Sequence, residues 1–273
     1  GVPVALAVDC WEPAARIHHA NHNALGEQTV IHELGDLEAD LALIREHLKP
    51  YRNHHFHLHG SPPCQALSQA SARDPAEGMP LVLHFLELVK HLKPDSWSME
   101  NVVPMKKRLP EWVPSVVLNA ADYGVPQTRR RCLAGEGWTA VPTHSQEEWV
   151  SVLQALPHLV KDLTPFRFAH RTRLNLDSCD ATVSRRARTA DVPLTRPSLT
   201  LRNNTPTLRE VTSTHAEKIR SLTVEETAIL QGFPADYVWL LDGLRKRDVW
   251  TAIGNSVCPP VARAIIQGIS HAN

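Results

Sequence analysis

The amino-terminal half of the chain alternates short apolar runs with stretches whose apolar residues recur at helical spacing. Strand-like runs occur at residues 2–8, 30–34, 55–59, 96–99, 116–120 and 131–134. Helical spacing is found at residues 13–22, 37–48 and 81–92. Short strands that alternate with helices are typical of a largely parallel sheet covered on both faces. The pattern therefore predicts an α/β fold with a doubly wound sheet.

The carboxyl-terminal part predicts three further helices. The first begins after Thr223, whose side chain can form a capping box with Glu226, and it ends at Gly232. Two more helices are predicted at residues 247–253 and 256–269. The last of these carries its apolar residues on one face, so it has a face to bury.

Residues 164–221 differ in composition from both flanks. The whole chain has 29 basic and 29 acidic residues, but residues 165–220 contain ten arginines and one lysine against five carboxylates. A basic segment of this kind is either a solvated or disordered lobe or a surface that binds phosphates and guanine edges. We therefore expect a first domain at residues 1–163, a small lobe at 164–221, and a part at 222–273 that returns to the first domain.

A proline-rich turn follows the strand predicted at residues 55–59. Pro62 and Pro63 fix two backbone φ angles and remove two amide donors, so the chain leaves the sheet in a rigid turn that presents Cys64. Ligands bind at the carboxyl edge of an open α/β sheet, and a deprotonated thiol held there is a nucleophile. The alternative is a small buried cysteine without chemistry, which is a common environment of free cysteine.

Two acidic residues end other predicted strands. Asp9 follows the run at 2–8, where a carboxylate can cap the next helix or accept hydrogen bonds from ribose hydroxyls. Glu100 follows the run at 96–99. Beside Cys64, a glutamate in this position can act as an acid or as a hydrogen-bond partner of a heteroaromatic base.

Five short motifs occur in a fixed order along the chain. They are Pro62-Pro63-Cys64-Gln65, Glu100-Asn101-Val102, Gln127-Thr128-Arg129-Arg130-Arg131, Leu230-Gln231-Gly232-Phe233-Pro234 and Gly254-Asn255-Ser256-Val257. In this order they resemble the DNA (cytosine-5)-methyltransferase family, whose motifs include PPCQ, ENV, QxRxR, LQGFP and GNSV. The resemblance spans residues 1–145 and 195–270. Each motif is weak by itself, whereas the ordered set is specific.

The resemblance implies a Rossmann-like methyltransferase sheet with a small target-recognition lobe at residues 164–221. It implies transfer of a methyl group from S-adenosylmethionine to C5 of a flipped cytosine in double-stranded DNA. The reaction would pass through a covalent bond between Cys64 and C6 of the base and leave S-adenosylhomocysteine. DNA methylation of this kind commonly belongs to restriction-modification systems.

The resemblance also implies the residues of the site. The catalytic residues would be Cys64, Glu100, Arg129 and Arg131. The cofactor would contact Asp9, Cys10, Trp11, Asp36, Leu37, Pro62, Asn255, Ser256 and Val257. The DNA would contact Gln65, Ser68, Arg185, Arg186, Arg188 and Gln231.

The chain departs from the family at its amino terminus. Family members begin with a strand and a glycine-rich F-x-G-x-G turn that approaches the methionine part of the cofactor, and this sequence contains no such turn. We expect either a preceding segment or a partner chain to supply the turn, or weak cofactor binding. The last possibility leaves open a DNA-binding or regulatory homologue without turnover.

A cysteine hydrolase and a histidine metal site are alternatives to a methyltransferase site. A cysteine hydrolase would use Cys64 with one of the sixteen histidines, but it explains neither Glu100-Asn101-Val102 nor the arginine triplet. A metal site at the closely spaced histidines His54, His55, His57 and His59 lacks a nearby carboxylate in sequence, so we expect no metal.

The remaining composition indicates a protein of a reducing compartment. Five cysteines are scattered without a C-x-x-C pair, which argues against a zinc module or a disulfide framework. No apolar run reaches membrane-spanning length, and residues 1–8 lack the basic start of a signal peptide. We expect a monomer in the cytoplasm, at the nucleoid of a prokaryotic or viral system, or in the nucleus of a eukaryote.

Overall fold

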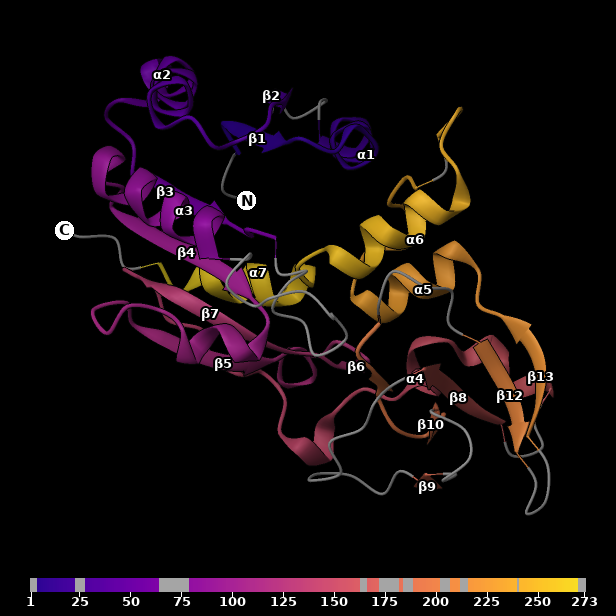
Figure 1. Ribbon diagram of the computed structural model, residues 1–273. Helices are drawn as coiled ribbons and strands as arrows, with labels where there is room; N and C mark the ends of the chain where they lie inside the picture. The colour runs from indigo at the N-terminus through magenta and orange to yellow at the C-terminus, as the bar shows by residue number, and fades with distance from the viewer. Residues whose placement is uncertain are drawn as a thin grey trace. The chain divides into compact units, whose positions relative to one another are not determined.

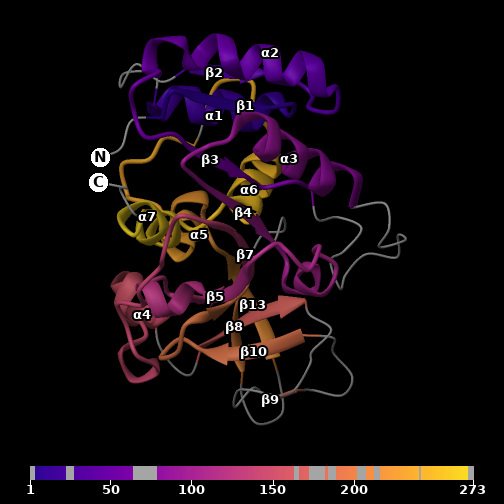
Figure 2. The ribbon, with the colours of Figure 1, turned by 90° about the vertical axis from the view of Figure 1, so that its left-hand side faces the viewer.

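A computed structural model of the chain describes residues 4–22, 28–63, 79–162, 166–171, 182–183, 189–201, 207–211, 216–239 and 241–269. Contacts within the chain divide it into two compact units. Unit 1 comprises residues 1–118, 130–141 and 264–273, and unit 2 comprises residues 119–129 and 142–263. Figures 1 and 2 show the elements of both units from two directions.

Unit 1 begins with two parallel strands, each followed by a helix. These elements are β1 (Leu6–Asp9), α1 (Glu12–His22), β2 (Gln28–Ile31) and α2 (Leu37–Leu48). Both helices agree with the helical spacing of the sequence. Strand β2 was predicted to continue to residue 34, but it ends at Ile31 because its pairing with β1 stops at Asp9↔Ile31.

The main sheet of unit 1 has the strand order β3-β4-β7-β5. Its strands are β3 (His57–Gly60), β4 (Ser96–Asn101), β5 (Ser115–Asn119) and β7 (Arg130–Glu136). Strand β4 pairs in parallel with β3 and antiparallel with β7. Helix α3 (Met79–Leu92) falls between β3 and β4 in sequence and lies over them in Figure 1, which gives the predicted βαβ arrangement.

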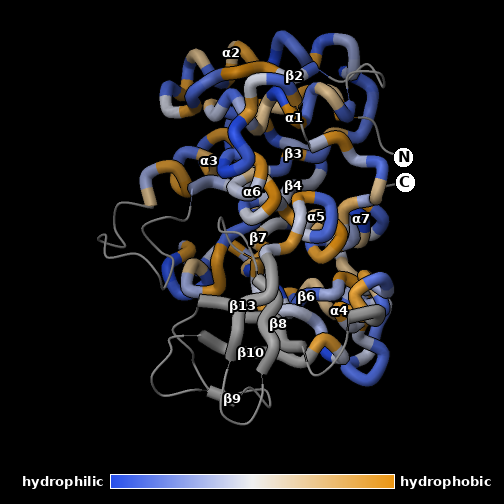
Figure 3. The backbone as a smooth tube through the Cα atoms, turned by 90° about the vertical axis from the view of Figure 1, so that its right-hand side faces the viewer, coloured by the Kyte–Doolittle hydropathy of each residue, from blue (hydrophilic) through white to orange (hydrophobic). Residues whose placement is uncertain are grey.

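Helix α3 packs closely on one face of this sheet. Its Val82 and Phe85 are buried with Trp97 and Met99 of β4 in one apolar cluster. Burying each such side chain stabilises the fold by about 1.5–3 kcal/mol. A Cβ at Gly60 would come within 2.3 Å of the Phe85 ring, so the approach of helix to strand requires glycine there. Hydrophobic and hydrophilic residues alternate along α2 and α3 in Figure 3, as expected of helices with one buried face.

Unit 2 contains an antiparallel sheet within the basic segment. Its strand order is β13-β12-β8-β10-β9. The strands are β8 (Phe166–Arg171), β9 (Thr182–Val183), β10 (Thr189–Pro193), β12 (Thr207–Val211) and β13 (Ala216–Ser221). A separate parallel pair joins β6 (Gln127–Thr128) to β11 (Ser198–Leu199). The segment that composition left open as a disordered lobe therefore contains regular β structure.

The predicted capped helix of unit 2 is confirmed. Helix α5 (Val224–Gln231) has Thr223 as its N-cap, with reciprocal hydrogen bonds between Thr223 and Glu226 at 3.1 and 2.8 Å. Gly232 follows in the left-handed region (φ 90°), where glycine carries no Cβ penalty. The other helices of this unit are α4 (Val152–Ala155) and α6 (Lys246–Asn255). Short 3₁₀ helices along the chain are Lys49–Tyr51, Val103–Lys107, Ala120–Tyr123, Gln146–Glu148 and Pro157–Asp162.

The last helix is shorter than the sequence predicted. Helix α7 runs from Pro259 to Gln267, whereas the prediction was residues 256–269. Ser256 has extended backbone angles (φ −66°, ψ 151°) and caps the end of α6 instead. The prediction was wrong at the start because proline is favoured in the first turn of a helix and disfavours helical angles in the residue before it.

Replacing Gly135 by Ala should destabilise unit 1 strongly. Gly135 has φ 146°, and a Cβ there would lie 2.0 Å from the carbonyl oxygen of Trp97, so β4 and β7 could not keep their register. We expect a loss of more than about 2 kcal/mol in the free energy of unfolding, measured with urea.

Gly35→Ala is the matched control for that experiment. Gly35 has a similar φ of 158°, but an added Cβ would meet nothing within 4 Å. It should therefore show the cost of backbone strain without the collision, and a loss equal to that of Gly135→Ala would contradict the packing argument.

Candidate functional site

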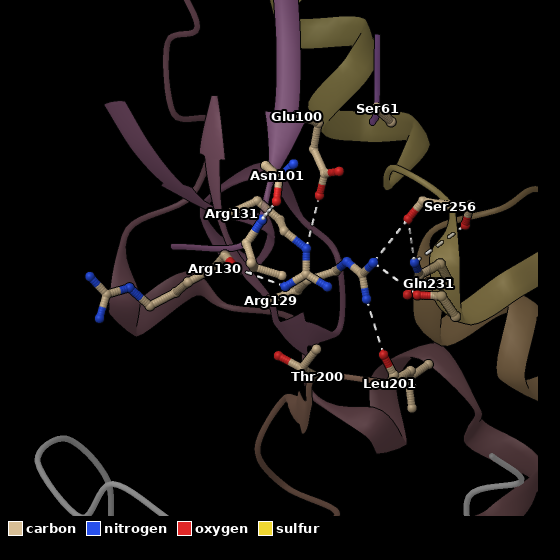
Figure 4. Close-up of polar contacts among 12 residues, drawn as sticks. Ser61, Glu100, Asn101, Arg129, Arg130, Arg131, Thr200, Leu201, Gln231 and Ser256 are labelled. Carbon is tan, nitrogen blue, oxygen red and sulfur yellow. Dashed lines mark hydrogen bonds and ion pairs between the residues drawn. The ribbon is translucent and has the colours of Figure 1, made fainter. Parts of the chain in front are cut away.

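A buried ion pair lies at the carboxyl end of β4 in unit 1. Glu100 is 8% exposed, and its Oε1 lies 2.9 Å from Nε of Arg131 on the neighbouring strand β7 (Figure 4). A second nitrogen of Arg131 donates to the carbonyl oxygen of Arg130 at 2.9 Å. A charge-assisted hydrogen bond offsets the cost of burying both charges, so the carboxyl group is held in one orientation at the sheet edge.

Asn101 ties the start of the cysteine loop to the same strand end. Its Nδ2 donates to the carbonyl oxygen of Pro62 at 3.1 Å, and its Oδ1 accepts from the amide of Val102 at 2.9 Å. The described part of the loop ends at Pro63. Cys64, Gln65 and Ser68 lie outside the described residues, as do Arg185, Arg186 and Arg188 of the basic segment.

The two aspartates expected to bind a nucleoside lie at one edge of the β1-β2 pair. Asp9 ends β1, and one of its oxygens accepts from the amide of Trp11 at 2.7 Å. Asp36 caps α2, and its Oδ1 accepts from the amides of Glu38 and Ala39 at 3.1 and 3.2 Å. Both residues are exposed, and each carboxylate has a second oxygen that can accept from a ligand hydroxyl or amine. The backbone hydrogen bonds of both aspartates therefore leave each carboxylate able to accept from a ligand.

The neighbours of these aspartates complete the edge. Cys10 is an exposed free thiol beside the half-buried Trp11. Leu37 packs against a cluster that includes Leu41 of α2 and Leu88 of α3. Two carboxylate acceptors beside an aromatic ring and a leucine suit ribose hydroxyls, an adenine amine and an adenine ring, so the residues present fit the nucleoside half of S-adenosylmethionine.

A buried carboxylate that the sequence did not reveal fixes the turn before Asp36. Asp40 is 0% exposed; its Oδ1 lies 2.6 Å from Nε2 of His32, and its Oδ2 lies 2.7 Å from Nε2 of His84. The amide of Gly35 donates to the same Oδ2 at 2.9 Å. Desolvation raises the pKa of the Asp40 carboxyl, but these hydrogen bonds outweigh it and hold that pKa below its usual value. Asp40 therefore anchors the Gly35-Asp36 turn to helices α2 and α3.

The remaining predicted residues belong to unit 2, where Arg129 is 3% exposed. Its guanidinium donates to the carbonyl oxygens of Leu201 at 3.0 Å, Gly254 at 2.9 Å and Ser256 at 3.2 Å. Two of these carbonyls lie at the end of α6, where helix carbonyls lack partners within the helix. Arg129 thus holds the Gly254–Ser256 turn in place (Figure 4).

Gln231 has a different environment from the DNA contact that was expected. It is 0% exposed, it donates to the carbonyl oxygen of Ser256 at 2.9 Å, and it accepts from Gln127 at 2.7 Å. A fully buried amide presents no face to DNA in this structure, so Gln231 supports the Ser256 turn from inside. Asn255 is exposed and Val257 is half-buried on either side of Ser256.

Two general features of the described residues bear on the function. No group of three or more His, Cys, Asp or Glu side chains among them is arranged to hold a metal ion. None of their helices is long and apolar enough to cross a membrane.

Comparisons with known proteins place a family match and several type II methyltransferases beside this chain. The family described as C-5 cytosine-specific DNA methylase matches residues 1–110 and 137–271. Type II methyltransferase M1.HphI of Haemophilus parahaemolyticus is 30% identical over 262 residues, which cover 78% of this chain and 68% of that protein. Type II methyltransferase M.AplI of Arthrospira platensis is 27% identical over 254 residues, which cover 80% of this chain and 69% of that protein.

Solved structures share the fold. An E. coli protein described as a candidate DNA modification methyltransferase encoded within a prophage has a TM-score of 0.62 at 20% identity, over 98% of this chain and 91% of that one. The Dnmt2 methyltransferase of S. pombe has a TM-score of 0.57 at 15% identity, over 96% of this chain and 89% of that one. The predicted Rossmann-like α/β fold is thereby confirmed.

Replacing Asp40 by Asn should lower the free energy of unfolding by about 1–3 kcal/mol near neutral pH, because the Gly35 amide and the two histidines lose a charged acceptor. The folded-state pKa of Asp40 is depressed, so its stabilisation is present above the unfolded-state pKa of about 3.9 and is lost as pH falls through the folded-state pKa. Urea unfolding of both proteins across this pH range measures the difference, which should close only under acid conditions.

Glu46→Gln on the same helix is the control. Glu46 pairs with Lys49 at an exposed position, where an ion pair contributes little to stability. The role assigned to Asp40 would be wrong if Asp40→Asn and Glu46→Gln had the same stability at neutral pH.

Proposed function

The chain belongs to the C-5 cytosine-specific DNA methylase family, and from that premise we propose that it methylates cytosine through a covalent bond between Cys64 and C6 of the base. The observation that carries the proposal is the buried Glu100–Arg131 pair at the carboxyl end of β4. The next residue, Asn101, holds the start of the loop that continues to Cys64. A carboxyl group and a cysteine loop are thus attached to one strand end, as addition to a pyrimidine ring requires.

Cys64 has the role of nucleophile in this proposal. C5 of cytosine is a poor nucleophile by itself, and addition of a thiolate at C6 turns the ring into an enamine that is reactive at C5. S-Adenosylmethionine supplies the methyl group at that stage. After C5 loses its proton, the bond between sulfur and C6 breaks and the thiolate is restored.

Glu100 and Arg131 stabilise the ring during addition. The negative charge that the sulfur brings to the ring is neutralised at N3, where Glu100 in its protonated form donates a hydrogen bond. Arg131 fixes the carboxyl group through the 2.9 Å contact and can donate to O2 of the base. Arg129 has a positioning role, since its guanidinium is occupied by three backbone carbonyls.

The cofactor would be bound in two parts. Asp9 accepts from the ribose hydroxyls and Asp36 from the adenine amine, with Cys10, Trp11, Leu37 and Pro62 beside them and the turn Asn255, Ser256 and Val257 completing the set. The methionine part needs a glycine-rich turn that this sequence does not contain.

The sheets of unit 1 offer a position for a glycine-rich strand and turn. Among the described residues, β1 pairs only with β2, and β3 is an edge strand of the four-stranded sheet. Leu6 of β1 and Leu58 of β3 nevertheless pack against the same apolar cluster of α2 and α3. We propose that a strand and turn from a preceding segment, or from a partner chain, binds between these two edges, because unpaired strand edges accept a further strand.

DNA would be recognised by the small lobe at residues 164–221, between the catalytic domain (1–163) and the returning part (222–273). The target cytosine must leave the duplex to reach Cys64, at an unstacking cost of a few kcal/mol. Arg185, Arg186 and Arg188 are proposed to bind phosphates or guanine edges, and Gln65 and Ser68 to contact the flipped nucleotide. We propose that the enzyme is a monomer and acts in the cytoplasm at the nucleoid, or in the nucleus if the source is eukaryotic. A role in restriction-modification fits the similarity to type II methyltransferases.

A second candidate function is a DNA-binding homologue that does not turn over. The two candidates differ in whether a covalent bond to cytosine forms.

Replacing Cys64 by Ser should abolish methyl transfer, because a hydroxyl group does not ionise near neutral pH as a thiol can. DNA affinity should stay within about twofold of wild type, since the nucleophile contributes little to binding. DNA with 5-fluorocytosine at the target should trap a covalent adduct on the wild-type protein, detectable on a denaturing gel. An adduct that maps to Cys10 or Cys132, or a Cys64→Ser protein that still methylates, would contradict the assignment.

Replacing Arg185, Arg186 and Arg188 together by Gln should weaken the salt dependence of DNA binding. Each phosphate contact contributes about 0.9 to the slope of log affinity against log salt concentration, so the triple variant should lose up to about three such contacts. Fluorescence anisotropy with a short duplex at several salt concentrations measures the slope. An unchanged slope would place the phosphate contacts elsewhere in the protein.

A further inference from the structure

Histidine and serine side chains alternate in a row along β3 and β4. His57 and His59 lie on one face of β3, and Ser96 and Ser98 lie beside them on β4. The sequence drew attention to these histidines as a metal site, but the side chains between them are hydroxyls. The row continues beyond β3 at both ends, to His55 and Ser61, and we call these six residues the histidine–serine ladder.

Five contacts join the ladder without a break. Nε2 of His55 lies 3.0 Å from Oγ of Ser96, which lies 2.7 Å from Nδ1 of His57. Nε2 of His57 lies 2.9 Å from Oγ of Ser98, which lies 2.8 Å from Nδ1 of His59. Nε2 of His59 lies 3.2 Å from Oγ of Ser61. From His55 to Ser61 the extended chain advances by six residues, which corresponds to roughly 20 Å, so the ladder is a long hydrogen-bonded path.

Such a row is unusual on this sheet. Parallel strands buried between helices normally carry apolar residues on both faces. Strands β3 and β4 do so only on the face toward α3. Ser96 and Ser98 are nevertheless only 1% and 0% exposed. Burial, followed by the neighbouring histidines, lowers the pKa of His57 to about 4, so this ring is neutral at pH 7.

Imidazole rings and hydroxyl groups in one row can form a continuous chain of donors and acceptors. A neutral imidazole has one donor and one acceptor nitrogen, and each hydroxyl can donate once and accept at the same time. If each ring carries its proton on Nε2, then each ring donates to the serine on one side and accepts from the serine on the other. This assignment satisfies all five contacts and points every proton from His55 toward Ser61. The opposite tautomer in every ring satisfies the same contacts in the reverse direction, so the row can carry a proton either way.

The ladder leads toward Glu100. Ser96, Ser98 and Glu100 are alternate residues of β4, so they share one face of the strand. The pairing of β3 with β4 ends at Gly60 opposite Met99, so Ser61 follows β3 at the end of the sheet where Glu100 lies. Figure 4 shows Ser61 and Glu100 at this same end of the sheet.

We propose that the histidine–serine ladder relays a proton from solvent at His55 to the carboxyl group of Glu100 during the addition step. The proposal rests on the function proposed above. Glu100 gives a proton to N3 of the cytosine once the thiolate has added, and the Glu100 carboxyl group must then be supplied with another proton. His55, His59 and Ser61 of the ladder are exposed. The proposal requires bound DNA to cover the His59–Ser61 end, so that His55 is the opening of the path to water.

The addition of the thiolate to C6 conserves protons and electrons. The sulfur electron pair forms the bond to C6, the ring electrons move toward N3, and N3 takes one proton from Glu100. Glu100 takes a proton from the Ser61 hydroxyl, and each ladder member is resupplied by its neighbour up to His55, which takes one proton from water. The same proton returns along the path when the bond between sulfur and C6 breaks, so the ladder ends each cycle unchanged.

Ser98→Ala tests the relay, because it removes the hydroxyl between His57 and His59. The full-length protein is mixed with 5-fluorocytosine DNA and cofactor, and the rate of covalent adduct formation is measured beside DNA affinity. We expect the rate to fall by at least about tenfold while affinity stays unchanged. Thr29→Val is the matched control, because it removes a hydroxyl that also contacts a histidine, His18 at 3.0 Å, outside the ladder.

A second variant separates proton transfer from packing. His57→Ala leaves a cavity between Ser96 and Ser98 that added imidazole can fill. Imidazole should restore the rate, whereas 1-methylimidazole should not, because its one free nitrogen can accept a proton but it has no N–H to pass a proton on from the other side of the ring. A rate in Ser98→Ala equal to wild type, or equal rescue of His57→Ala by the two compounds, would overturn the relay. A wild-type protein that forms no adduct would instead refute the proposed function, and the relay with it.

Discussion

The buried ion pair between Glu100 and Arg131 is the interaction on which the arrangement of unit 1 depends. A carboxylate at 8% exposure is costly unless a cation is held against it, and Arg131 can be held there only if β7 pairs antiparallel with β4. That pairing brings Gly135 against the Trp97 carbonyl and leaves no room for a side chain. The same strand end holds Pro62 through Asn101, so the loop that leads to Cys64 starts from a fixed point.

Strand β4 has an apolar face and a polar face, and both contact other elements of unit 1. On one face β4 buries Trp97 and Met99 against α3, and on the other it carries Ser96 and Ser98 of the histidine–serine ladder. An apolar face can pack with many different residues of suitable volume, whereas a buried hydroxyl needs a hydrogen-bond partner at one defined position. The polar face therefore restricts the register of β3 and β4 more tightly than the apolar core does. Burying hydroxyl and imidazole groups costs desolvation energy, and a function for these groups gives a reason for that cost.

Local patterns in the sequence were sufficient to predict helices α1 to α3, the strands of the main sheet of unit 1 and the capped helix α5, but not the antiparallel sheet of unit 2. The capping box of Thr223 and Glu226, the helix at residues 37–48 and the position of Glu100 at a strand end each depend on residues close in sequence, and the structure has them as predicted. Contacts between distant residues were not predictable in this way. Asp40 meets His84, and Arg129 meets the carbonyl of Gly254, only because the chain returns to the same place after many residues. Alternating His and Ser on two predicted strands was the one available signal of the ladder, and it required knowledge of the strand register.

The central claim is that this protein transfers a methyl group to C5 of cytosine in DNA. The direct measurement uses tritium-labelled S-adenosylmethionine, the full-length protein and double-stranded DNA, followed by hydrolysis of the DNA to nucleosides and their separation. The account predicts that the label elutes with 5-methylcytosine. Label in N4-methylcytosine or N6-methyladenine, or no label in DNA, would contradict it.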